Sequence, residues 1–215
     1  MSENPNDSLR SISPIISGPF DLCTNSLAQR TYSKGEIIIQ RGQRLNSAYF
    51  LKKGKVKHVI TTINGEERIS FYSVGPCLIG EVPFLTGFPP YVDTVACEKS
   101  TVQLLTREEL FLNCNWETLY TTLALKLRSQ AFLIEGDCLA ANERICRFLY
   151  VLSITSSNNI LKITQKEIAD ITGLHRITVN EVIKDLENRQ AISKSRGTIR
   201  LLDAEGIKIL SGLGI

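Results

Sequence analysis

The residues from Thr164 to Lys184 have the types and spacing that recognition of nucleic-acid bases requires. Thr164 and Glu167 predict a capping box at the start of a helix, in which each side chain satisfies a free backbone N–H of the other residue. Gly173 supplies a residue that tolerates the positive φ of a tight turn. The segment therefore predicts two short helices joined by a turn, the second starting near His175.

Each of these two helices has an apolar side that predicts a packed interface between them. Ile168 and Ile171 give the first helix a buried face, and Ala169 is small where the second helix approaches closely. Val179, Val182 and Ile183 do the same for the second helix. A helical hairpin that binds no DNA is the alternative interpretation of this pattern.

The other side of the second helix is polar, and base edges in the major groove of DNA suit such side chains. An arginine can donate two hydrogen bonds to guanine, an asparagine can pair with adenine, and a glutamate can accept from cytosine. A solvated surface is the competing interpretation for each position. The candidate DNA-binding residues of this helix are His175, Arg176, Thr178, Asn180, Glu181 and Lys184.

A hairpin carrying further positive charge follows this helix. The segment 192–202 predicts two strands that turn at Gly197, with Lys194 and Arg196 placed to contact the DNA backbone. From Asn142 onward the chain has 11 Lys and Arg against 8 Asp and Glu, whereas the remainder has 14 of each sign. The whole net charge of +3 thus lies in the C-terminal third, as expected for a module that faces phosphates.

The part of the chain that must position this module has a different pattern. From Tyr32 to Thr106 it consists of short runs rich in Val, Ile, Phe and Tyr between glycines, which is typical of a sandwich or jelly-roll barrel. Asn64 and Gly65 predict a type I′ turn, in which both residues have positive φ, between strands over 55–62 and 66–74. The predicted fold class is α+β.

A long helix is expected to follow the barrel. Its apolar residues recur in steps of three and four, and Gln130 interrupts the series. Such a stripe either packs on the barrel of its own chain or forms a coiled-coil seam with a second copy. In the second case one face covers the barrel and the other covers the partner. The candidate dimer-interface residues are Trp116, Tyr120, Leu123, Leu127 and Ile134.

Composition excludes several classes of protein. The chain is 43% apolar and 22% charged, which is typical of a globular protein. The first 14 residues are polar, and the longest apolar run, 148–152, is too short to span a membrane, so we expect a cytoplasmic protein without membrane association.

The residues available for catalysis or metal binding are few. The chain has only two histidines, His58 and His175, and no nucleophile and base can be paired, so an enzyme is not expected. Its six cysteines include no C-x-x-C pair, which favours reduced, buried side chains over disulfides or a metal cluster. A redox role for one exposed thiol stays open.

Short segments along nearly the whole chain match one known pattern. They are YSKGEII at 32–38, YFLKKGKV at 49–56, Gly65-Glu66, Gly75-Pro76, Ile79-Gly80-Glu81 and the helix-turn-helix. With these segments the chain resembles the CRP/FNR superfamily of bacterial regulators. The resemblance implies a tail at 1–18, a cyclic-nucleotide-binding-type jelly-roll barrel at 19–111, a dimerisation helix at 112–140 and a winged helix-turn-helix at 141–215.

The resemblance also implies a mode of action. It predicts a homodimer that binds a pseudo-palindromic site on double-stranded DNA, contacts RNA polymerase, and is switched by a small effector or a redox signal. Most relatives carry Arg where Glu181 stands, and many carry Glu where Ile177 stands. We therefore expect a half-site that differs from the usual one.

Other departures from the family pattern concern cofactors. Relatives that bind cyclic AMP have an arginine ten residues after the Gly-Glu pair, where this chain has Tyr91 and Val92. An apolar pair cannot neutralise a phosphate, so cyclic AMP is not expected. Iron–sulfur relatives have an N-terminal cysteine cluster, whereas this segment has only Cys23, and His58 is in a different strand from the axial ligand of haem relatives. No cofactor is therefore expected.

The remaining resemblance is to the subgroup that answers small aromatic compounds, such as the chlorophenol-responsive halorespiration regulator. Phe71-Tyr72 and the stretch 172–175 carry it. It implies a pocket between the barrel and the long helix, in which Lys126 either counters an acidic group of the ligand or faces solvent. A redox-responsive or ligand-independent regulator, or a binding module that does not bind DNA, is the alternative. The candidate effector-binding residues are Tyr72, Gly80, Glu81, Tyr91, Val92, Tyr120, Leu123 and Lys126.

Overall fold

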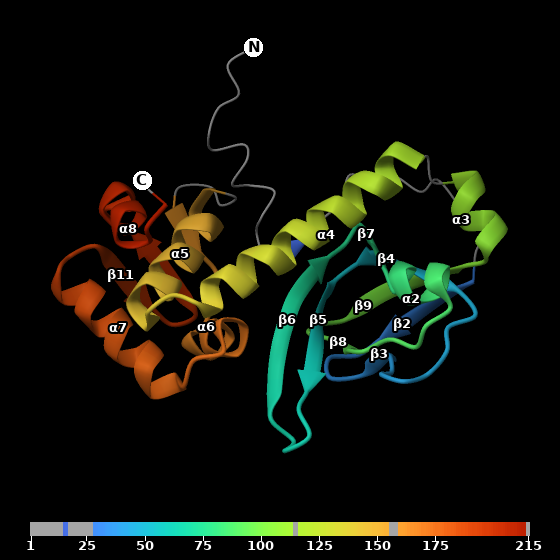
Figure 1. Cartoon of the computed structure of the whole chain (residues 1–215), viewed down its shortest axis with the longest axis horizontal. Coiled ribbons are helices and arrows are strands. Elements are labelled where there is room, and N and C mark those ends of the chain that lie inside the picture. Colours follow the sequence, from blue (N-terminus) through green and yellow to red (C-terminus); the bar gives the residue numbers. More distant parts are fainter. Residues whose placement is uncertain (1–14, 17–27, 114–115, 155–158, 214–215) are drawn as a thin grey trace, which may run out of the picture. The chain divides into compact units, whose positions relative to one another are not determined.

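The computed structural model describes residues 15–16, 28–113, 116–154 and 159–213. The chain divides into two compact units, of which one extends to Leu127 and the other begins at Arg128. The division falls within a single long helix, α4 (Trp116–Asp137), which therefore contributes residues to both units. Figure 1 shows the elements in chain order from blue to red.

Two sheets make up most of the N-terminal unit, as the sequence predicted. The five-stranded sheet has the order β1-β6-β5-β8-β3, and the four-stranded sheet has the order β2-β9-β4-β7. All strand pairs are antiparallel except β1 with β6. The strands are β1 (Ile15–Ile16), β2 (Gln29–Tyr32), β3 (Ile37–Ile39), β4 (Ala48–Lys53), β5 (Lys55–Thr61), β6 (Glu67–Val74), β7 (Cys77–Ile79), β8 (Asp93–Ala96) and β9 (Ser100–Leu105).

An apolar core fills the space between these sheets. Leu51, Val56 and Leu78 are fully buried in it, and they come from β4, β5 and β7. Side chains alternate along a strand, so the short apolar runs between glycines supply one inward face to each sheet. Leu119 of α4 joins the same cluster, which attaches the first part of that helix to the barrel.

The strands β5 and β6 form the predicted hairpin, which is the long ribbon in Figure 1. Of the two turn residues only Gly65 has a positive φ, of 80°. Its N–H donates to the carbonyl of Thr62 at 3.0 Å, which closes a turn one residue earlier than a type I′ turn over Asn64 and Gly65 would. The type I′ prediction is therefore wrong, and the turn is of the kind in which a left-handed glycine follows an ordinary turn.

The N-terminal tail prediction is wrong for two residues. Ile15 and Ile16 form β1, and they pair in parallel with Tyr72 and Ser73 of β6. A two-residue strand has no periodicity of its own, so only the edge of β6 reveals it. The other residues of the predicted tail lie outside the described residues.

The helices of this unit include two short ones. α2 (Glu81–Thr86) begins directly after Gly80, whose φ of 70° is left-handed, and α3 (Arg107–Asn113) precedes α4. A Cβ at position 80 would lie 2.7 Å from the end of the Ile39 side chain, so that side chain would have to shift, and the left-handed φ would strain any other residue. The predicted long helix at 116–134 is confirmed and ends three residues later.

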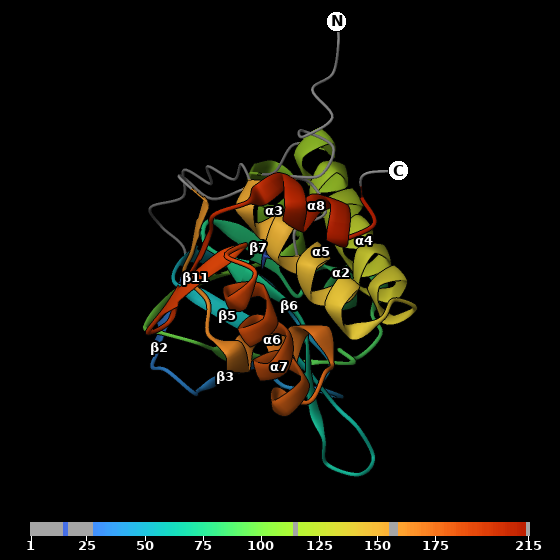
Figure 2. The same cartoon turned by 90° about the vertical axis from the view of Figure 1, so that its left-hand side faces the viewer.

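The C-terminal unit, drawn in yellow to red in Figure 2, contains the predicted winged helix-turn-helix. Its three-stranded sheet has the order β10-β12-β11, and β10 was not predicted from the sequence. Ile145, Leu149, Ile168 and Ile183 are fully buried in its core. No described helix in either unit is both long and apolar enough to cross a membrane. The elements are α5 (Ala141–Ile154), β10 (Ile160–Leu161), α6 (Gln165–Thr172), α7 (Arg176–Asn188), β11 (Ile192–Ser195), β12 (Thr198–Leu201) and α8 (Ala204–Leu210).

A histidine lies inside the barrel. His58 of β5 is 3% exposed, its ring stacks on Phe71 with centroids 4.0 Å apart, and its two nitrogens share hydrogen bonds with Ser73 at 2.9 Å and Thr94 at 3.1 Å. Burial, and then the positive charge of Lys126, hold the pKa of His58 well below its ordinary value. The imidazole is therefore neutral in the folded protein at neutral pH.

We predict that this histidine makes the protein less stable in mild acid. The unfolded chain takes up a proton at His58 near pH ~6.5, whereas the folded chain does so only at lower pH. The free energy of unfolding should therefore fall, by up to about 1.4 kcal/mol per pH unit, as the pH drops below that value. Urea unfolding between about pH 7.5 and about pH 5.5 measures the slope.

The variant His58→Gln should lose this part of the slope because glutamine takes up no proton. His175→Gln is the matched control, since it replaces the only other histidine, which is exposed. Equal slopes for the wild type and His58→Gln would contradict the prediction.

Candidate functional site

The two helices α6 and α7 meet at the turn that the sequence predicted. The backbone N–H of Thr164 donates to Glu167 at 2.9 Å, and that of Glu167 donates to the hydroxyl of Thr164 at 3.2 Å, so the capping box is confirmed. Gly173 ends α6 with a φ of 68° and donates its N–H to Ala169 at 2.9 Å. These contacts fix the direction in which the chain enters α7.

An arginine that the sequence analysis did not select holds this turn from α5. Arg144 donates to the carbonyl of Thr172 at 2.9 Å, directly before Gly173. The same guanidinium donates to the carbonyls of Asp137 at 2.7 Å and Leu139 at 3.2 Å, where α4 ends. One side chain thus connects the end of α4 with the turn before α7.

The helix α7 has one buried and one exposed face. Val179 and Ile183 are fully buried, as the apolar pattern predicted, whereas Val182 is only half-buried. Leu186, which the sequence analysis did not select, is also buried. His175 is the N-cap residue, and Arg176 is the first helical residue. Of the candidate DNA-binding residues on this helix, Thr178 is half-buried and the others, His175, Arg176, Asn180, Glu181 and Lys184, are exposed.

The wing is the hairpin of β11 and β12, turning at Gly197 with a φ of 71°, as predicted. Glu187 of α7 accepts a hydrogen bond from the backbone N–H of Lys194 at 3.2 Å and pairs with its ammonium group at 3.2 Å. This pairing attaches the wing to α7, and the positive charge of Lys194 is paired with the carboxylate of Glu187. Arg196 is exposed beside the turn.

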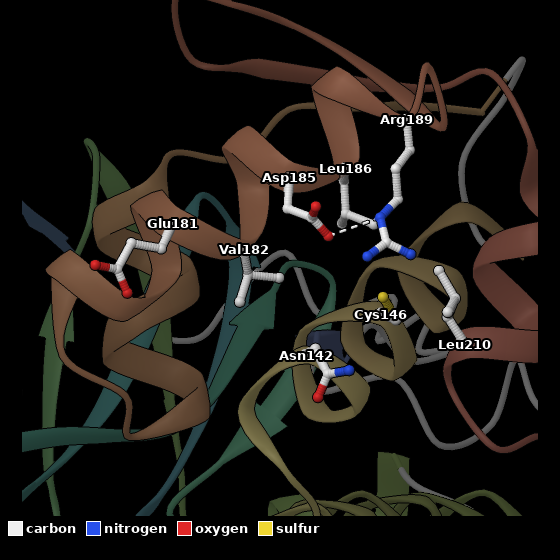
Figure 3. Close-up of a pocket in the computed structure, with 8 residues that line it drawn as sticks. All are labelled: Asn142, Cys146, Glu181, Val182, Asp185, Leu186, Arg189 and Leu210. Atoms are coloured by element: carbon white, nitrogen blue, oxygen red, sulfur yellow. Dashed lines mark ion pairs between the residues drawn. The ribbon is translucent and has the colours of Figure 1, made fainter.

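A half-open pocket of about 260 Å³ lies on the side of α7 that faces α5 and α8. Figure 3 shows the ion pair of Asp185 with Arg189, at 2.8 Å, on one side of it and Cys146 of α5 beneath. Glu181 lies at the far end from Arg189. Glu181 therefore belongs both to the exposed face of α7 and to the lining of this pocket, and its carboxylate points away from the other lining side chains.

A buried ion pair joins the barrel to α4. The ammonium group of Lys126 lies 2.6 Å from a carboxylate oxygen of Glu81 and donates to the carbonyl of Leu78 at 2.8 Å. Glu81 is 1% exposed and Lys126 is 8% exposed, so neither charge is solvated. The other oxygen, Oε2 of Glu81, accepts no hydrogen bond from any described residue.

The structure brings together only some of the candidate effector-binding residues. Glu81 and Lys126 are in contact, Gly80 precedes Glu81, and Leu123 packs against the barrel core on the same helix as Lys126. Val92 is buried.

The three tyrosines of that set lie elsewhere. Phe71 and Ser73 contact His58 inside the barrel, so Tyr72 between them points to the other face of β6, where the ammonium of Lys55 lies 4.3 Å from its ring centre. Tyr91 is 61% exposed. Tyr120 is 63% exposed and stacks on Trp116, on a face of α4 other than that of Lys126.

The exposed side of α4 carries the candidate dimer-interface residues. Trp116, Tyr120, Leu127 and Ile134 are each more than half exposed, whereas Leu123 is half-buried. Tyr120, Leu127 and Ile134 are spaced by seven residues, which is the repeat of one coiled-coil position. An apolar stripe of this kind is left open in the single chain.

Two of the cysteines are buried, as expected for reduced side chains. Burial raises the pKa of the Cys77 and Cys146 thiols to about 11, so both are protonated and unreactive at neutral pH. Cys138 is exposed and Cys97 is half-buried, and neither forms a disulfide. Cys23 and Cys114 lie outside the described residues. Among the described residues no three His, Cys, Asp or Glu side chains gather as metal ligands.

Comparison with protein families matches both units. Residues 29–112 match the cyclic nucleotide-binding domain, and residues 143–209 match the Crp-like helix-turn-helix domain. Together the two matches cover more than half of the chain.

Individual proteins match over most of their length. The cyclic AMP receptor protein of Thermus thermophilus is 27% identical over 193 residues, covering 86% of this chain and 88% of that protein. The transcriptional activator protein FnrA of Stutzerimonas stutzeri is 26% identical over 196 residues, covering 85% and 80%. Among solved structures, CprK complexed with OCPA has a TM-score of 0.69 at 24% identity, covering 86% of this chain and 89% of that one. The two matched domains, in this order along one chain, identify it as a member of the CRP/FNR superfamily of DNA-binding transcription regulators.

Proposed function

We propose that the chain is a cytoplasmic homodimer that binds a pseudo-palindromic operator through α7 and the wing. A small effector controls this binding through α4. The exposed polar stripe of α7, held by the capping box and Gly173, carries the DNA-binding part of the proposal. Arg176 and Asn180 read bases from the first two turns of the helix. Arg196 contacts phosphate from the wing.

The open apolar stripe of α4 supports the homodimer. Trp116, Tyr120, Leu127 and Ile134 together expose more apolar surface than isolated side chains on a monomer do. A second copy of the same helix would cover the stripe with identical residues, which is the symmetry of a twofold interface. A dimer places two copies of α7 on the two half-sites of an operator.

The buried pair of Lys126 and Glu81 supports control by an effector. Lys126 is on the helix that forms the dimer seam, and Glu81 is at the start of α2 in the barrel. A ligand that alters this contact acts on both elements at once. It shifts the DNA-binding affinity if it binds one arrangement more tightly than the other.

The chemistry of this site favours a small ligand with an apolar body and one hydrogen-bond donor. Oε2 of Glu81 is a buried acceptor that no described donor satisfies, and such an atom is costly away from water. The similarly folded CprK has been observed with OCPA, so a fold of this kind can hold a small ligand. Contact with RNA polymerase belongs to the same proposal.

Cyclic AMP is the competing ligand, since the relative from Thermus thermophilus is named for it. We propose that this chain does not bind it. Val92 is buried and Tyr91 is exposed at the positions expected to face a phosphate, and neither carries a positive charge. The proposal likewise includes no iron–sulfur cluster and no haem.

The dimer is tested by placing a charge in the stripe. Leu127→Glu would bury an unpaired carboxylate in the seam, which is unfavourable, so light scattering should show a monomer and operator affinity should fall. Leu112→Glu is the matched control, because Leu112 of α3 is 84% exposed and lies outside the stripe. A Leu127→Glu variant that stays dimeric would contradict the prediction and show that the dimer interface lies on another surface.

The division of DNA contacts is tested by two arginine variants on a panel of mutated operators. Arg176→Ala should lose about 1–3 kcal/mol of binding free energy at one base pair and flatten the preference there. Arg196→Ala should weaken binding to all sequences alike and lower the salt dependence by about one charge. Indistinguishable profiles for the two variants would refute the assignment.

The control element is tested by breaking the ion pair. Lys126→Met leaves the Glu81 carboxylate buried without a counter-charge, which should lower the free energy of unfolding by about 3–5 kcal/mol. Adding Glu81→Gln should recover part of this loss. Lys57→Met, which breaks the more exposed pair with Glu67 at 3.9 Å, is the matched control and should cost about 0–1 kcal/mol.

The same variants test coupling to DNA. Under conditions in which each variant is folded, Lys126→Met should change the affinity for the operator in an anisotropy titration, although it alters no DNA-contacting residue. An unchanged operator affinity would mean that the ion pair stabilises the fold but does not influence DNA binding.

The proposal that cyclic AMP is not the ligand is tested by calorimetry. Titration of cyclic AMP into the wild type should give no heat of binding.

A further inference from the structure

An apolar side chain stands in the middle of the exposed face of α7. Ile177 is 72% exposed, although its neighbours along the same stripe, Asn180, Glu181 and Lys184, are polar. At about 100° per residue it lies opposite the buried residues of the helix. Packing among the described residues of the C-terminal unit therefore does not account for an isoleucine at this position.

The position of Ile177 in the helix determines what it meets. It is the second residue of α7, directly after Arg176. The N-terminal turn of a recognition helix is the part that enters the major groove. Ile177 is therefore presented to base edges rather than to phosphates.

Base edges in the major groove differ in how they receive an aliphatic side chain. Guanine, adenine and cytosine present hydrogen-bond donors and acceptors there, which lose water without compensation when an apolar group covers them. Thymine presents its C5-methyl group, which gains from the same contact. Isoleucine is also stiff at χ1 in a helix, so little rotamer freedom is lost on contact.

We propose that Ile177 is a specificity-determining residue that selects thymine in each half-site by contact with its C5-methyl group. The inference rests on the proposed binding of α7 in the major groove. It adds an apolar contact to the readout by Arg176 and Asn180. It also explains physically how this half-site differs from one read by a glutamate at the same position.

The test removes the methyl group from the DNA and from the protein separately. An operator is first selected from random duplexes with the full-length wild-type chain. Each thymine of one half-site is then replaced singly by deoxyuridine, which keeps base pairing and removes only the methyl group. Affinities are measured by fluorescence anisotropy for the wild type, Ile177→Ala and Ile209→Ala. Ile209 of α8 is the matched control, since it is 73% exposed and lies outside α7.

We expect one thymine at which deoxyuridine weakens wild-type binding by about fourfold, the effect of one buried methyl group. Ile177→Ala should bind the unmodified operator about as weakly as the wild type binds the deoxyuridine operator. Its affinity should not change when deoxyuridine replaces thymine at that position. Ile209→Ala should behave as the wild type.

Two results would overturn the inference, and they are distinguishable. A selected operator with no methyl-dependent position, or one whose methyl dependence survives in Ile177→Ala, refutes the role of Ile177 and leaves DNA binding intact. A wild-type chain that enriches no sequence refutes the proposed sequence-specific binding together with the inference.

Discussion

The ammonium group of Lys126 and the carboxylate of Glu81, 2.6 Å apart and both buried, cannot be separated without leaving a charge away from water. The desolvation of the two groups is offset by their attraction and by the hydrogen bond from Lys126 to Leu78. Lys126 lies two residues before Arg128, where the C-terminal unit begins. The barrel therefore holds α4 immediately before that helix passes into the other unit.

Features near the ion pair and at the far end of α4 bear on this contact and on its connection to α7. Gly80 adopts a left-handed conformation that other residues rarely adopt, which lets α2 start with Glu81 facing inward. His58 stays neutral nearby and so adds no second positive charge beside Lys126. At the other end of α4, Arg144 connects the helix terminus to the turn before α7. In the proposed mechanism a change at the ion pair travels along α4 to this arginine.

Much of the DNA-binding unit could be predicted because its signals are local. The capping box, Gly173 and the two apolar faces lie within some twenty consecutive residues and obey rules of helix geometry. The features that the sequence did not reveal depend on distant partners. The two-residue strand β1 exists only because β6 offers an edge, and the contacts of Arg144 join carbonyls that lie 28 residues and 7 residues from it.

The effector-site prediction likewise failed where the position of a residue depends on contacts with distant parts of the chain. The family resemblance placed Glu81 and Lys126 in the same candidate site, but it predicted that Lys126 faces a ligand or solvent, not that it pairs with Glu81. The tyrosines were chosen for their chemistry, and the strand alternation at Tyr72 and the helix face of Tyr120 point them elsewhere. Which side a residue faces depends on register, and the turn at Gly65 closes one residue earlier than the predicted type I′ turn over Asn64 and Gly65 would.

The stack of Trp116 between Phe111 and Tyr120 gives the molecule a built-in optical reporter. Trp116 is the only tryptophan of the chain, so all indole emission comes from one point on the open stripe of α4. The indole is 56% exposed in the single chain and would lose contact with water when another helix covers it. In the proposed dimer its emission wavelength would therefore register assembly without a label and without a substitution in the surface being observed.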